Sequence, residues 1–150
     1  MNEYIHYSRE ELKRVDHLIY VSLKYTRTGD VLKSAINRMV SSYDFMVDGL
    51  IQKLMDDGAF TEAPAVPMKK IAAVKEQFAS KPKLLEAMEF YLFLRKVNIA
   101  EFTSVHEFRR NVTMTVRVDD EPVDVTIDII MEYYKRTIDY IDYMEEIIRG

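Results

Sequence analysis

A short stretch after the midpoint of the chain, HEFRRNVTMTV, holds the side chains best suited to chemistry. Arg109, Arg110 and Asn111 stand where a helical pattern gives way to an alternating one. Guanidinium and amide groups suit phosphate, because they donate several directed hydrogen bonds. Together with Arg117 on the segment that follows, these residues form the predicted ligand or nucleic-acid binding site.

Structural roles are also open for this stretch. One arginine can pair with Glu107 or with the acidic last helix, and Asn111 can end the preceding helix as its C-cap. His106 precedes the arginines by three and four residues, so it can approach them on one helical face. His106 is the candidate for acid–base chemistry, but it fits no known motif, and we assign no catalytic residue.

The sequence gives no sign of metal, cofactor or cysteine chemistry. The three histidines lack the H-E-x-x-H spacing of zinc enzymes, and cysteine is absent. The four glycines are scattered singly, so no phosphate-binding loop is present, and no serine stands in a nucleophile elbow. We therefore expect no metal site and no cofactor.

Charge is unevenly distributed along the chain, whose formal net charge is −4. Residues 61–118 contain ten basic and six acidic side chains, whereas residues 119–150 contain three basic and ten acidic ones. The basic middle could meet phosphates. Alternatively, both segments are ordinary solvated faces, or the two segments attract each other within the fold. The negative total argues against tight, non-specific binding to nucleic acid.

Length and composition indicate one domain over residues 1–150. With 48% apolar and 31% charged residues, the chain can bury a core and should not be disordered. No apolar run approaches the roughly 20 residues that a membrane-spanning helix needs. The N-terminus lacks the apolar region of a secretory signal. We expect a cytoplasmic protein with no membrane partner.

A long central helix over residues 29–58 should organise the fold. Apolar residues recur there every three or four positions from Leu32 to Leu54, and further apolar side chains flank that stripe. Asp30 suits its N-cap or first turn, and Gly58 suits its stop. Such a helix must be surrounded, either by other helices or by a second copy of the chain.

A first helix should pack against the central one. Ser8, with Glu11 three residues later, forms a capping box, which predicts a helix from there to about Arg27. Tyr25 is expected to face inward. Two long helices joined by so short a break should lie antiparallel.

The second half of the chain predicts further helices and one hairpin. Helices are expected over residues 68–78 and from Pro82 onward, then a turn and a short helix around Ser104–Arg110. Alternating residues predict a β-hairpin near residues 112–127, before a last helix that runs to Ile148. The predicted fold is mainly α: an up-down helical bundle of four to five helices with an inserted β-hairpin.

This order of elements resembles the HEPN superfamily of nucleotide- and RNA-associated helical bundles. A helical hairpin whose second helix opens with Gly29-Asp30 carries the resemblance, together with Arg110 and Asn111 ahead of a long last helix. Catalytic members of that family are metal-independent endoribonucleases in which His and Arg of two subunits meet at a dimer interface. The resemblance therefore implies a helical bundle and a homodimer.

The chain departs from the family pattern at the histidine. In the family a histidine follows Arg-Asn within a few residues, a place that falls near Met114 or Thr115 here, and no histidine occurs after His106. Neither side chain exchanges a proton near neutral pH as imidazole does. The resemblance thus implies at most a degenerate active site.

The leading hypothesis is a non-catalytic HEPN-like bundle that acts as a dimeric interaction module or associates with RNA or nucleotides. One alternative is a toxin-like, metal-independent endoribonuclease with an altered site that uses His106. Another is a purely structural protein whose hairpin adds a strand to a protein partner. The homodimer prediction depends on the resemblance and on the large apolar surface of the central helix.

Overall fold

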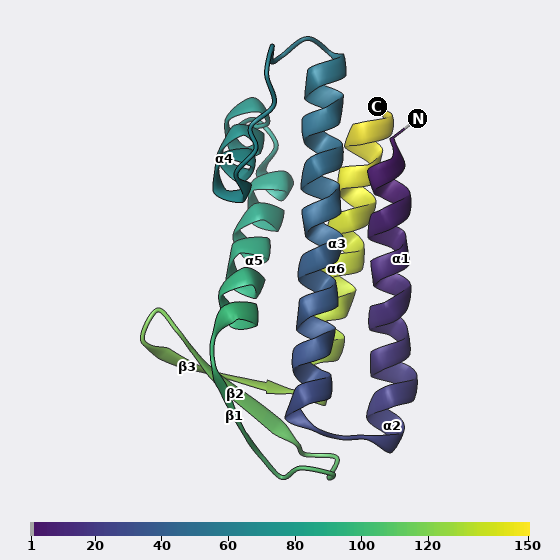
Figure 1. The fold of residues 1–150 in the computed structure, drawn as a ribbon, viewed down its shortest axis with the longest axis vertical. Coiled ribbons are helices and arrows are strands. Elements are labelled where there is room, and N and C mark those ends of the chain that lie inside the picture. Colours follow the sequence, from purple (N-terminus) through teal and green to yellow (C-terminus); the bar gives the residue numbers. More distant parts are fainter. Residues whose placement is uncertain (1) are drawn as a thin grey trace.

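The computed structural model describes residues 2–150 as a mainly helical protein with one small antiparallel sheet, so the predicted mainly α class is confirmed. Three long helices lie side by side: α1 (Glu3–His17), α3 (Gly29–Asp56) and α6 (Ile127–Arg149) (Figure 1). Across α3 from α1 lie α4 (Pro67–Gln77) and α5 (Pro82–Ile99). Within residues 2–150, no helix is both long and apolar enough to cross a membrane.

The central helix α3 forms as its periodicity predicts. Thr28 is its N-cap, since the Thr28 hydroxyl accepts a hydrogen bond from the Val31 amide at 3.2 Å, and Asp30 lies in the first turn. Gly58 follows the helix with φ 79°, so the predicted stop is confirmed. α1, α4, α5 and α6 all pack on α3 and bury its apolar residues within one chain. Its apolar surface therefore does not require a second copy.

The first helix begins earlier than the capping-box pattern predicts. Asn2 is the N-cap of α1, and its side-chain oxygen accepts a hydrogen bond from the Tyr4 amide at 3.1 Å. Ser8 lies buried in mid-helix, where its hydroxyl donates to the Ser42 carbonyl of α3 at 2.9 Å. The predicted start at Ser8 is wrong because Ile5 is buried in the core, which extends the helix toward the N-terminus.

The end of the first helical segment is irregular. A π-helix, η1 (Leu18–Ser22), follows α1, and one further turn, α2 (Leu23–Tyr25), completes the segment before α3. A π-turn holds more residues than an α-turn, so it rotates later side chains out of the earlier register. Tyr25 is accordingly 81% exposed, and the prediction that it faces inward is wrong.

The sheet has three strands where a two-stranded hairpin was predicted. They are antiparallel, in the order β1 (Phe102–Val105), β2 (Thr113–Val118), β3 (Glu121–Thr126). Asp119 and Asp120 have φ 52° and 67°, as in a two-residue type I′ turn between β2 and β3. The short helix predicted around Ser104–Arg110 is wrong, because Ser104 and Val105 end strand β1, where Ser104 pairs with Met114. The residues after them form turns, in which His106 and Phe108 have positive φ.

The sheet lies across one end of the helices (Figure 1). Val112, Met114 and Val116 are buried toward α3 and α5, while the threonines between them point to the other face. Gly29, the first residue of α3, touches β1 so closely that a Cβ there would lie 2.8 Å from the Ser104 Cβ. The start of α3 and the sheet therefore form one packed unit.

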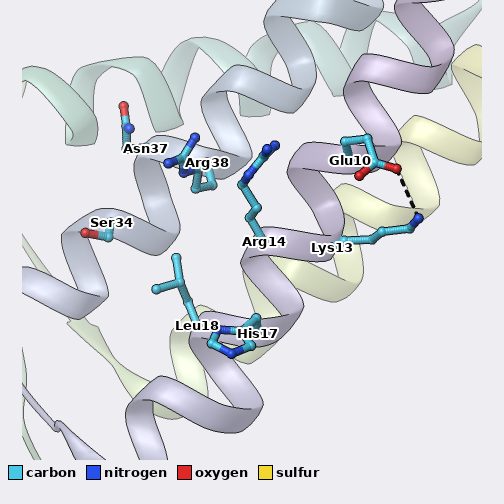
Figure 2. A pocket seen from close by; sticks show the side chains of 8 residues that line it. All are labelled: Glu10, Lys13, Arg14, His17, Leu18, Ser34, Asn37 and Arg38. Carbon is cyan, nitrogen blue, oxygen red and sulfur yellow. Dashed lines mark hydrogen bonds and ion pairs between the residues drawn. The ribbon is translucent and has the colours of Figure 1, made fainter.

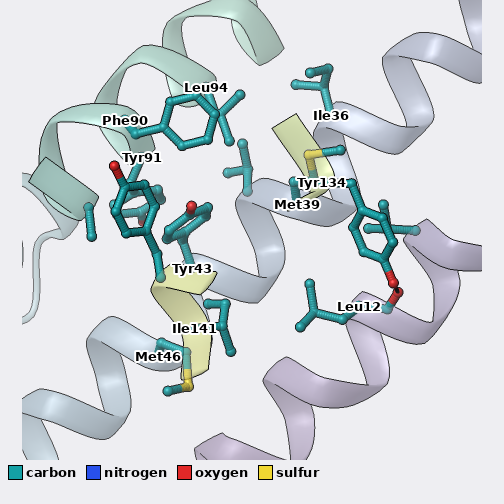
Figure 3. Close-up of a cluster of buried hydrophobic side chains, with 14 of the residues drawn as sticks. Leu12, Ile36, Met39, Tyr43, Met46, Phe90, Tyr91, Leu94, Tyr134 and Ile141 are labelled. Atoms are coloured by element: carbon teal, nitrogen blue, oxygen red, sulfur yellow. Dashed lines mark hydrogen bonds between the residues drawn. The ribbon is translucent and has the colours of Figure 1, made fainter. Parts of the chain in front are cut away.

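Aromatic residues fill the core between α3, α5 and α6 (Figure 3). Tyr43 is fully buried, its ring stacks on Tyr91 with centroids 5.3 Å apart, and its hydroxyl donates to the Thr137 hydroxyl at 3.2 Å. Burial raises the pKa of both tyrosines. The Tyr91 hydroxyl donates to Asp44, whose pKa burial also raises.

Candidate functional site

The loop between β1 and β2 holds most of the predicted site, and it is fastened to the start of α3. The Glu107 carboxylate accepts hydrogen bonds from the Gly29 amide at 3.1 Å and from the Ser104 hydroxyl. The Phe108 amide donates to the Arg27 carbonyl at 2.6 Å. A carboxylate is favourable at a helix N-terminus, where free amides and the helix dipole attract it. Glu107 therefore anchors the loop and pairs with no arginine in residues 2–150.

The predicted binding residues are only partly brought together. His106, Arg110 and Asn111 line a shallow hollow of about 550 Å³ beside the start of α6. Arg110 forms an ion pair with Asp128 of α6 at 2.7 Å, so the predicted pairing with the last helix is confirmed. Asn111 is exposed and follows no helix, so its predicted C-cap role is wrong. Because Asp128 faces the same hollow, the arginine's charge there is balanced.

The two other predicted arginines lie elsewhere. Arg117 is at the far end of β2, where its guanidinium donates to the Asp120 carbonyl at 2.5 Å and lines a different hollow with the start of β1. Arg109 is exposed on the loop and lines neither hollow. The four residues are therefore not a single site.

A second hollow, which the sequence analysis missed, lies between α1 and α3 and has a volume of about 480 Å³ (Figure 2). Most of its polar lining is basic or amide in character: Lys13, Arg14, His17, Asn37 and Arg38. Glu10 lies at its edge and pairs with Lys13 at 3.0 Å. Such a concentration of donors is typical of a site for an anion.

The arginines of this hollow are held in place by a buried carboxylate. The Glu11 side chain is only 9% exposed and accepts from Arg14 at 2.8 Å and from Arg38 at 3.2 Å. Each arginine uses one terminal nitrogen for Glu11, and within residues 2–150 no other acceptor engages either guanidinium. Their side chains are 53% and 43% exposed, so the remaining donors face solvent. The triad carries a net charge of +1 and is oriented before any ligand arrives.

The register of α1 against α3 creates this triad. The Asn2 side chain donates to the Gly49 carbonyl at 2.8 Å, Ser8 meets Ser42, and Glu11 meets Arg38, as two antiparallel helices require. Glu11 and Arg14 stand one turn apart on α1, which the sequence could have revealed. Arg38 joins them through helix packing, for which the sequence has no local signal.

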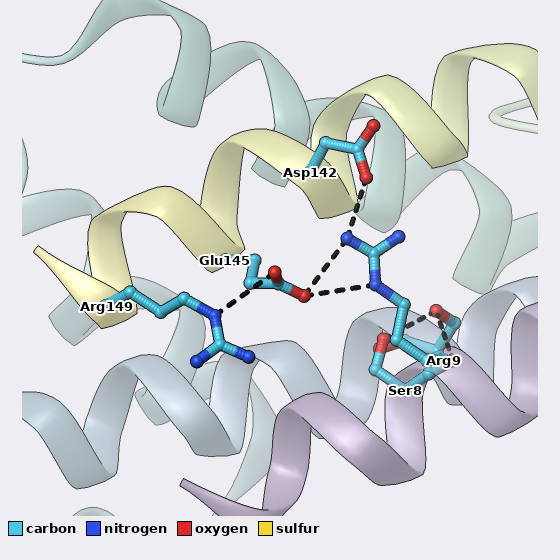
Figure 4. A network of polar contacts seen from close by, with 6 residues as sticks. Ser8, Arg9, Asp142, Glu145 and Arg149 are labelled. Carbon is cyan, nitrogen blue, oxygen red and sulfur yellow. Dashed lines mark hydrogen bonds and ion pairs between the residues drawn. The ribbon is translucent and has the colours of Figure 1, made fainter. Parts of the chain in front are cut away.

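A second ion-pair network ties α1 to α6 (Figure 4). Arg9 donates to Asp142 at 2.7 Å and to Glu145 at 3.1 Å, and Arg149 donates to the other oxygen of Glu145 at 3.2 Å. Burial would raise the pKa of Glu145, but the hydrogen bonds from the two arginines outweigh it and lower that pKa. Every guanidinium here faces a carboxylate, so the network fits helix docking better than ligand binding.

Within the described part of the chain, no three His, Asp or Glu side chains are grouped so that they could hold a metal ion. No protein-family model matches this chain, and no curated protein and no solved structure matches it either. The geometry of the two hollows is therefore the basis for a functional proposal.

Proposed function

We propose that this protein is a HEPN-like, up-down helical bundle that acts as a non-catalytic, dimeric module for RNA or nucleotides. One observation carries the proposal: the buried Glu11 holds Arg14 and Arg38 side by side at an open hollow between α1 and α3. Two guanidinium groups fixed in this way match the oxygens of a phosphate, which accept two hydrogen bonds at once. A cytoplasmic location is part of this proposal.

The proposal is non-catalytic because the sequence lacks the histidine that the family pattern would place near Met114 or Thr115. The arginines of the α1–α3 hollow bind and position, which needs no proton exchange. The dimer in this proposal depends on the family resemblance alone, since α3 is covered within one chain.

A second candidate function is metal-independent RNA cleavage. It is favoured by the single hollow that His106 and Arg110 share. RNA cleavage in the presence of a chelator that disappears in His106→Ala would support it. If the wild-type protein does not cleave RNA, this second function is excluded and the non-catalytic binding module remains.

Binding of a short, fluorescently labelled RNA and of a nucleotide, measured by anisotropy at low and moderate salt, tests the first proposal. Arg38→Ala should weaken binding by about tenfold or more, the cost of a charge-assisted hydrogen bond to phosphate. Lys69→Ala is the matched control, because it removes the same charge from α4, on the far side of α3. Weaker binding by Arg110→Ala would show that RNA or the nucleotide contacts the hollow that His106, Arg110 and Asn111 line.

Equal affinities for Arg38→Ala and Lys69→Ala would refute the α1–α3 site. A shallower salt dependence in Arg38→Ala, by about one unit of slope, is expected if the lost contact is to a phosphate. Light scattering of the free protein tests the dimer, and a monomeric mass would remove that part of the proposal.

A further inference from the structure

Phe108 is exposed at an unusual cost to the fold. Its side chain is 75% exposed, and its backbone has φ 67°, a left-handed conformation that bulky residues rarely adopt. Holding a residue other than glycine there costs about 1–3 kcal/mol. Packing of the ring does not offset that cost, because among residues 2–150 the ring is not part of the hydrophobic core. The ring is therefore presented to solvent by a strained loop.

The loop is also prevented from relaxing. The Phe108 amide is bonded to the Arg27 carbonyl, and the neighbouring Glu107 is bonded to the amide of Gly29. These bonds place Phe108 beside the connection between α2 and α3. Arg27, which accepts the bond, follows Tyr25 by two residues. The ring of Tyr25 is 81% exposed as well. Two aromatic rings thus project from one end of the molecule on backbones that the fold holds.

The charges around these rings favour nucleic acid over a protein partner. Lys24 precedes Tyr25, Arg27 follows it two residues later, and Arg109 follows Phe108, so each ring has basic neighbours in the sequence. Glu107, the acidic neighbour of Phe108, is turned inward onto the start of α3. Exposed aromatic rings interleaved with basic side chains are the usual platform for stacking unpaired bases.

This end of the molecule continues directly from the α1–α3 hollow. His17 lines the hollow, and the chain runs on through η1 and α2 to Tyr25, eight residues later. Arg14, the phosphate-binding residue of α1, precedes Tyr25 by eleven residues, which at about 1.5 Å per residue span roughly 16 Å. A few nucleotides of extended chain cover such a distance, whereas one mononucleotide does not.

We infer that the ligand is single-stranded RNA, with phosphates at Arg14 and Arg38 and unpaired bases stacked on Phe108 and Tyr25. The inference rests on the proposed function and deepens it, since it names the ligand class and adds two contacts outside the hollow. A base-paired strand keeps its bases stacked on each other and cannot offer them to these rings.

Anisotropy with one RNA sequence, as a single strand and as a duplex, tests the inference. Phe108→Gly should weaken single-strand binding roughly 5- to 100-fold, the range for loss of one stacked base. Because glycine relieves the strained φ, the melting temperature should not fall. Tyr25→Ala should act in the same way, and Tyr25→Phe should retain binding. Ile99→Ala is the matched control, since it removes another apolar side chain, 83% exposed, at the end of α5.

The outcomes separate this inference from the proposed function. If Arg38→Ala weakens binding while Phe108→Gly and Tyr25→Ala bind as the wild type does, stacking is refuted and the phosphate site stands. Equal affinity for single strand and duplex also overturns the inference. If the wild-type protein binds no RNA in either form, the RNA part of the proposed function fails, and the stacking fails with it.

Discussion

The triad of Arg14, Glu11 and Arg38 predicts a strong non-additivity in stability. Either arginine can be replaced by alanine while the Glu11 carboxylate keeps the other partner. Each arginine side chain is about half exposed, so each single loss should cost about 1 kcal/mol or less. In the double variant the carboxylate, 9% exposed, has no partner left among residues 2–150.

An unpaired buried charge is far costlier than a broken pair at the surface. Removing every partner of such a group typically costs about 3–5 kcal/mol. Arg14→Ala with Arg38→Ala should therefore destabilise the protein by about 1–3 kcal/mol more than the sum of the single changes, the range found for residues in one network. Adding Glu11→Gln removes the charge and should recover most of that excess.

Urea unfolding followed by circular dichroism measures these free energies, provided that the slope with urea is the same in all variants. Lys13→Ala is the control, because Lys13 lines the same hollow but pairs with Glu10 and not with Glu11. Its stability should match the wild type. If the two arginine changes add to within about 0.5 kcal/mol, Glu11 does not depend on them jointly, and the argument for a preoriented phosphate site is wrong.

Two further predictions concern the core and the sheet. Because burial raises the pKa of Tyr43, the folded protein keeps a phenolic proton that the unfolded chain loses near pH 10. The unfolding free energy should therefore fall above pH 10, with Tyr43 contributing up to about 1.4 kcal/mol per pH unit. Tyr43→Phe should show a shallower decline between pH 10 and 11, and an equal slope would contradict the assignment. Gly29→Ala should cost about 1–3 kcal/mol in urea unfolding, since the new Cβ meets Ser104 at 2.8 Å. A variant as stable as the wild type would mean that the sheet can move away from α3.

Features set by neighbouring residues could be predicted from the sequence. The repeat of apolar residues specified α3, and Gly58 specified its end. Pro82 marked the start of α5, and the alternation after Asn111 marked β2 and β3. Each of these signals lies within or at the end of the element that it predicts, so no distant contact was needed to interpret it.

Features that depend on distant contacts could not be predicted. β1 is four residues long and forms by pairing with β2, so its own sequence carried little strand signal. The start of α1 was missed because burial of Ile5 outweighed the capping pattern at Ser8. Arg110 was assigned to a site by its neighbours in sequence, yet Asp128 on α6 neutralises it.

The sequence by itself determined the helical class, the long central helix and the presence of arginines able to bind phosphate. Tertiary structure decided which arginines are available. Arg38 meets Glu11 because α1 and α3 pack antiparallel in one register, and these residues are 27 positions apart in the chain. The strained, exposed Phe108 likewise exists because Arg27 and Gly29 hold its loop. The sequence gives the type of each side chain, but the packing of the helices and the sheet determines which partners it contacts and how exposed it is.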